Sequence, residues 1–271
     1  MLKNSIKVWV MSLLFTVLLA YFGHWLWGRQ GTLLGIVVSL AMCFVIFSAA
    51  NQLASSFFRA RRLEGNDAWN LQEKLEHIGR RAKIEPPKIY LIPTSYPAAF
   101  VCGMKSDSYA LYVTEGLLKR LTPDEIEAVL AHLVARLKNK DVLPAMVGAV
   151  LAASLLSFTD QMPTGAPNFF SRLFFFIFVP FAWIAIHIHS KPSHIFKADL
   201  LASQWISDPM ALAKALWKLE CYAQTLAPAL PYALSHLFVV NPLTGRRFAR
   251  YFSVHPPVSQ RIKKLVGAFP I

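Results

Sequence analysis

The sequence is poor in acidic residues and in cysteines. Asp and Glu number 15 against 28 Lys and Arg in 271 residues, which gives a formal net charge of +13. Cys43, Cys102 and Cys221 are scattered and odd in number, which argues against a disulfide framework or a CxxC site. The basic residues follow apolar runs and form no aromatic-studded motif, so we expect contact with anionic lipid headgroups and no nucleic-acid binding.

Charged residues are also rare in four long apolar runs. Hydrophobic residues make up 55% of the chain and the mean hydropathy is +0.42, which is high for a soluble domain. The runs cover 8–21 (continuing through FGHWLWG), 32–50, 142–158 and 169–188, and we interpret them as four transmembrane helices. The first has no small-x-small cleavage site after it, which favours an uncleaved anchor over a signal peptide.

The distribution of basic residues predicts the orientation of these spans. On one side they are flanked by Arg59, Arg61, Arg62, Lys138, Lys140, Lys191 and Lys197, whereas the loops on the other side carry only Arg29 and Asp160. Because cytoplasmic loops are enriched in Lys and Arg, both soluble parts and both termini are expected in the cytoplasm of a cell whose inner or plasma membrane holds the spans. The predicted order is two spans (1–58), a first soluble part (59–141), two spans (142–189) and a second soluble part (190–271).

The soluble parts predict an α+β fold that is mainly helical. An amphipathic helix is expected over 66–83, and β-rich segments at KIYLIP, AAFVCGM and YALYVTEGLL predict a small sheet. Thr122, Pro123 and Glu125 form a helix start, and the helix that follows places His132 and Arg136 on one face. Further helices are expected over 196–206, over 209–224 and after HPP at 255–257.

The chain resembles the HtpX-like membrane zinc metallopeptidases, relatives of the CAAX prenyl proteases. The likeness rests on the order of spans and domains, on IYLIPTSYPAAFVCG before a strand ending in TEGLL, and on LTPDEIEAVLAH opening a helix. It continues with Asp141 after that helix, FKAD after the fourth span and FSVHPPVSQRI near the end. The resemblance implies a zincin-like cytoplasmic domain divided by the second pair of spans.

The resemblance also implies a zinc site, and this chain departs from it. In such peptidases zinc is held by the two histidines of His-Glu-x-x-His and by a glutamate four residues before an aspartate, while the first glutamate is the general base. His132 matches the first ligand, Leu133 the base, Arg136 the second ligand and Ile195 the third, and Asp199 matches the aspartate. Only His132 and Asp199 survive.

The replacements remove the chemistry that zinc needs. Leu133, Arg136 and Ile195 carry no group that binds zinc or accepts a proton at neutral pH, and the charge of Arg136 would repel a dication. We therefore predict a pseudopeptidase with no metal cofactor, in which Asp199 bonds His132, Arg136 or both as a remnant. A thiol nucleophile at Cys102 with His132 as base is disfavoured because no oxyanion donor is evident, and His255 is interpreted as part of a turn.

The predicted function is binding in membrane-protein quality control. An edge strand including Ala98, Ala99, Phe100 and Gly103 would pair with an unfolded or membrane-protein segment, although the family has Asn-Ala-Phe where this chain has Ala98, Ala99 and Phe100. Partnership with an active protease is a second possibility. Two alternatives stay open: a structural protein whose cleft is closed by Arg136 and Asp199, and an active metalloprotease with rearranged ligands, namely His132, His187, His189, His194 and Asp199.

Overall fold

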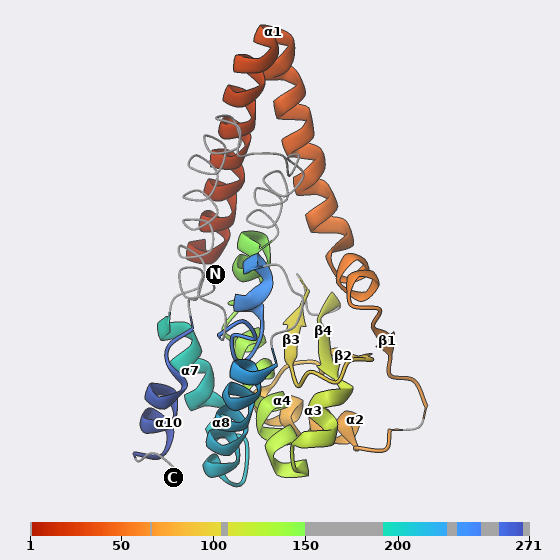
Figure 1. Cartoon of the computed structure of the whole chain (residues 1–271), viewed down its shortest axis with the longest axis vertical. Helices are drawn as coiled ribbons and strands as arrows, with labels where there is room; N and C mark the ends of the chain where they lie inside the picture. Colours follow the sequence, from red (N-terminus) through yellow and green to blue (C-terminus); the bar gives the residue numbers. More distant parts are fainter. Residues whose placement is uncertain are drawn as a thin grey trace.

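The computed structural model describes residues 2–65, 67–103, 108–149, 192–226, 232–244 and 255–267. A long helical hairpin rises from a domain in which helices pack beside a four-stranded sheet (Figure 1).

The hairpin is a single assigned helix, α1 (Leu2–Phe57, 56 residues), whose path is interrupted at Trp27 and Gly28. Gly28 has φ 58° and ψ −136°, a conformation that glycine adopts without steric cost, and the chain reverses there (Figure 1). A Cβ added to Gly31 would lie 1.8 Å from the carbonyl oxygen of Gly23. The two arms therefore approach backbone to backbone, as small residues permit in membranes, and the hydroxyls of Thr16 and Ser39 join them at 2.7 Å.

Among the described residues, α1 is the one helix long and apolar enough to cross a membrane, over Ser12–Val45. Its two arms cover the first two predicted spans, and large apolar side chains such as Leu13 and Phe44 point outward with 64% and 72% of their surface exposed. The other two predicted spans fall largely outside the described residues, and only 142–149 are described, as helix. The number of spans and their orientation stay predictions.

The predicted small sheet is confirmed. Its strands are β1 (Arg61–Arg62), β2 (Lys88–Ile92), β3 (Ala99–Cys102) and β4 (Ala110–Thr114), in the order β1-β2-β4-β3. The β2 and β4 strands are parallel, and the other two pairs are antiparallel. Every residue of β3 and β4 is buried, so β3 is an edge strand that solvent does not reach.

The helices enclose α4 (Pro123–Lys138), which packs against α2 (Leu71–Ala82), α7 (Pro192–Ser203) and α8 (Pro209–Thr225). Further helical elements are α3 (Glu115–Arg120), the 3-10 helix η2 (Tyr232–Leu237) and α10 (Val258–Val266). The predicted capping box of α4 is present, because the Thr122 hydroxyl accepts from the Glu125 N–H and the Glu125 carboxylate accepts from the Thr122 N–H.

Two predicted helix boundaries differ from the structure. The first helix begins at Leu71, not near 66, because Asn70 is left-handed with φ 52° and interrupts the helical path. The helix expected over 196–206 already includes Pro192, the first described residue of this part of the chain, and ends at Ser203.

Candidate functional site: a buried ion-pair cluster

The two surviving motif residues face each other in the core between α4 and α7. His132 and Asp199 are 1% and 2% exposed, and His132 Nδ1 lies 2.8 Å from Asp199 Oδ1. The ring is not well aligned for a hydrogen bond, but at this short distance Nδ1 interacts with the carboxylate as a weak donor, and this contact helps to lower the pKa of Asp199.

Asp199 finds its strongest partner in Arg261 of α10, a residue that the sequence analysis did not single out. Arg261 Nε donates to Oδ2 at 2.8 Å and Nη2 donates to Oδ1 at 2.7 Å, while Nη1 donates to the carbonyl of Val239 at 2.7 Å. Arg261 is fully buried, so this bidentate pair ties α10 to α7. The available signal was the motif FSVHPPVSQRI, in which Arg261 is the one Lys or Arg on the first turn of the last helix.

Arg136 lies one helical turn after His132 on α4 and is also buried. It is 7% exposed, and its Nη1 donates to the carbonyl of Leu237. Burial lowers the pKa of Arg136 to about 10, against the favourable charge of Asp141, which acts on it more strongly than Asp199 does. The guanidinium is therefore charged at neutral pH and donates to Leu237. Among the described residues Asp199 forms its ion pair with Arg261, so the predicted bond from Asp199 to Arg136 is not seen.

The charges of the cluster follow from these contacts. Burial by itself would raise the pKa of Asp199, but the charge and hydrogen bonds of Arg261, together with His132, lower it to about 2. Burial lowers the pKa of His132 below its usual 6.5, and the nearby Asp199 opposes this. At neutral pH the cluster holds an ionised Asp199, a neutral His132 and two positive guanidinium groups.

The residues at the positions of the implied zinc site do not fit a zinc ion. Leu133 is 0% exposed in the hydrophobic core and Ile195 is 9% exposed, and neither carries a donor atom. Arg136 brings a positive charge to the position of the second ligand. Within the part of the chain that the structure describes, no group of three or more His, Cys, Asp and Glu side chains is placed to hold a metal ion.

The histidines of the alternative ligand set are only partly described. His194 lies at the start of α7 and contacts Asp141 through Nδ1 and Oδ1, whereas His187 and His189 lie outside the described residues. Cys102 is buried in β3, and burial raises the pKa of its thiol to about 12, which disfavours a thiolate nucleophile. His255 lies in the turn before α10, where its Nε2 contacts the carbonyl of Ser235 at 3.4 Å.

The edge strand predicted to receive a peptide is covered by the chain itself. Residues 235–240, here called the strap, comprise the end of η2 and the residues after it, and they contact β3 at two residues. Phe238 forms an antiparallel bridge with Phe100, and the Val239 N–H donates to the carbonyl of Ala99 at 3.1 Å. On the other side of β3, the Ala98 N–H is bound to the Thr114 hydroxyl at 2.9 Å. The N–H of Gly103 meets Met146 Sδ at 3.2 Å.

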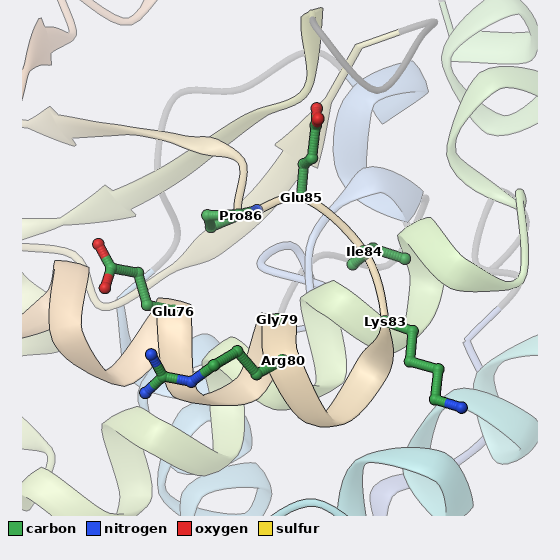
Figure 2. Close-up of a pocket in the computed structure, with 7 residues that line it drawn as sticks. All are labelled: Glu76, Gly79, Arg80, Lys83, Ile84, Glu85 and Pro86. Carbon is green, nitrogen blue, oxygen red and sulfur yellow. The ribbon is translucent and has the colours of Figure 1, made fainter.

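A surface hollow of about 410 Å³ lies at the end of α2, outside this cluster. Its charged side chains point in different directions and do not converge on one point (Figure 2). It is lined by Glu76, Gly79, Arg80, Lys83, Ile84, Glu85 and Pro86.

Known proteins are similar to this chain over nearly its whole length. The family model "Peptidase family M48" matches residues 64–268. A "Protease HtpX homolog" of Pelotomaculum thermopropionicum is 32% identical, with 97% of this chain and 98% of that protein covered. Another protein of that description, from Campylobacter hominis, is 31% identical, with 97% of each chain covered.

A solved structure supports the same fold. The crystal structure of S. mikatae Ste24p matches with a TM-score of 0.55 and 17% identity, over 98% of this chain and 67% of that one. The family resemblance drawn from the motifs is thereby confirmed: the chain belongs to peptidase family M48 and is a homologue of the HtpX proteases.

Proposed function

We propose that this chain is a membrane-anchored M48 member that does not hydrolyse peptides with zinc and acts by binding. The observation that carries the proposal is the buried guanidinium of Arg136, which stands at the position of the second ligand and donates to the Leu237 carbonyl. A single lost ligand would weaken a metal site. A fixed positive charge in a buried setting opposes a dication outright.

The remnant pair supports the same proposal. In a zinc peptidase of this family, the residue matching Asp199 would accept a hydrogen bond from a metal-ligating histidine, on the side of the ring away from the metal. Here both oxygens of Asp199 are taken by Arg261, and His132 touches the same carboxylate. The pair therefore joins α4, α7 and α10, a structural task that needs no metal.

The proposed binding partner is an extended segment of an unfolded or membrane protein, held by backbone pairing along β3, or else an active protease. The exposed apolar hairpin α1 would keep the domain at the bilayer, with the soluble parts on the cytoplasmic side as the basic residues predict. Such a protein would take part in membrane-protein quality control by holding a client without cleaving it.

Metal content tests the proposal. Zinc is measured by inductively coupled plasma mass spectrometry on the detergent-purified protein and on the triple variant Leu133→Glu, Arg136→His, Ile195→Glu. The unmodified protein is expected to be free of stoichiometric zinc, whereas the triple variant regains the ligand set. Casein hydrolysis, with and without chelator, is followed in parallel.

A matched control separates ligands from the base. The variant Leu133→Gln, Arg136→His, Ile195→Glu restores the ligands without a general base, so it is expected to bind zinc and leave casein intact. Near-stoichiometric zinc together with chelator-sensitive cleavage in the unmodified protein would overturn the proposal. That result would direct attention to the set formed by His132, His187, His189, His194 and Asp199.

A further inference from the structure

We infer that Arg136 is a latch that holds the strap over β3, so that the chain keeps its own segment where an extended peptide would pair. The inference rests on the proposed function, because the covered strand is the proposed binding site, and it adds how access to that site is controlled. Opening the site then requires residues 235–240 to leave β3.

Among the described residues, the strap pairs with β3 through one isolated bridge, Phe238–Phe100, and the backbone hydrogen bond beside it runs from the Val239 N–H to the Ala99 carbonyl. A regular ladder would repeat such bonds along the strand. A single bridge leaves much of the attachment to other contacts, and these identify what controls release.

Two arginines from different helices supply the charged contacts. Arg136 of α4 donates to the carbonyl of Leu237, and Arg261 of α10 donates to that of Val239. The two acceptor carbonyls flank Phe238, so the guanidinium groups bind the strap on both sides of the bridge. Hydrogen bonds from charged donors are stronger than neutral ones, and Arg261 is already fixed by Asp199.

Arg136 is the attachment peculiar to the altered motif. It stands where the resemblance implies a histidine that binds zinc, and its side chain instead reaches the strap. The substitution therefore does two things at one position: it excludes the metal and it adds a bond to the segment that covers β3.

Aromatic packing links the strap to the membrane hairpin. The ring of Phe238 lies 4.9 Å from that of Phe100 and 6.3 Å from that of Phe58, measured between centroids. Phe58 directly follows α1, which ends at Phe57. The ring cluster therefore places the strap in contact with the residue that follows α1.

Hydrogen exchange measured by mass spectrometry on the full-length protein in detergent tests the latch. The Arg136→Gln variant is expected to speed exchange in peptides covering 235–240 and 99–102 by about tenfold or more, because local opening becomes easier when a charged hydrogen bond is lost. Peptides covering α2 and β2 should exchange as before. Arg120→Gln is the matched control, since Arg120 also donates to a backbone carbonyl, that of Ser95, away from the strap.

A second variant attacks the strap from its other side. Phe238→Ala removes the aromatic packing and leaves Arg136 in place, and it should loosen the same two segments. Binding of fluorescein-labelled, reduced and carboxymethylated α-lactalbumin, a permanently unfolded chain, is then compared among the variants. It is expected to tighten at least about tenfold when the strap opens, because the competent fraction rises.

The exchange and binding results distinguish a latch from a general stabilising role of Arg136. Faster exchange confined to the strap and β3, with tighter binding of the unfolded chain, supports the latch. Unchanged exchange in Arg136→Gln overturns it, and so does faster exchange throughout the domain, which would make Arg136 a general stabiliser of the fold. None of these readouts depends on zinc, so the latch and the proposed absence of zinc-dependent hydrolysis can fail separately.

Discussion

The buried pair of Asp199 and Arg261 makes a quantitative prediction about stability. Replacing Asp199 with Asn keeps the shape of the side chain and removes its charge. The fully buried guanidinium of Arg261 then keeps two acceptors, the Val239 carbonyl and the amide oxygen of the new Asn. Breaking one partner of such a pair costs about 3–5 kcal/mol. Because the amide oxygen of Asn still accepts one bond, we expect a value near the lower end, about 3 kcal/mol.

The effect is measured as a melting temperature. A loss of about 3 kcal/mol corresponds to a fall of roughly 6–12 °C for a domain of this size, and tryptophan fluorescence of the protein in detergent follows the transition. Asp208→Asn is the matched control, because Asp208 is exposed and caps α8 by accepting from the Met210 N–H, a role that Asn also fills. A fall below about 2 °C in Asp199→Asn, equal to that of the control, would refute the stabilising role of the pair.

A double-variant cycle shows whether the two residues act together. Arg261→Gln leaves Asp199 without its bidentate partner, and combining it with Asp199→Asn removes both charges. The double variant should lose less stability than the sum of the two single losses, because it leaves neither charge buried without its partner. Additive losses would mean that the two side chains stabilise the fold separately.

Three further predictions concern pH, the hairpin and the cysteines. Burial lowers the pKa values of His132 and His255 below 6.5 in the fold, so below that pH the unfolded chain takes up protons that the folded chain does not. In denaturant titrations the free energy of unfolding should fall as the pH drops, with each histidine contributing up to about 1.4 kcal/mol per pH unit, and His132→Asn should remove its share of this slope. A disulfide should form between Thr16→Cys and Ser39→Cys, whose hydroxyls lie 2.7 Å apart, and Gly31→Leu should abolish it by forcing the arms apart. Maleimide should label exposed Cys221 in the folded protein but buried Cys102 only after unfolding; equal labelling of both would contradict the enclosed strand.

The sequence predicted the helices and strands of this protein better than the long-range contacts between them. The sheet and the capped start of α4 follow from local patterns, because alternation and capping act between neighbouring residues. The pairing of Asp199 with Arg261 does not, because it joins side chains 62 positions apart and depends on how α10 packs on α7. The covering of β3 was missed for the same reason: no local feature of residues 235–240 marks them as a partner for an edge strand.

The charges of the altered centre explain why its substitutions occur together. In the implied zinc site, two glutamates would balance the two charges of the metal, and without the metal both would be unpaired carboxylates in a core, which is costly. Here those positions hold Leu133 and Ile195, which are 0% and 9% exposed and apolar. The one charge introduced, that of Arg136, lies near Asp141, while Asp199 keeps Arg261. Each of these buried charges thus has an opposite charge acting on it within the same core, so the fold can hold these residues in place of two glutamates and a dication.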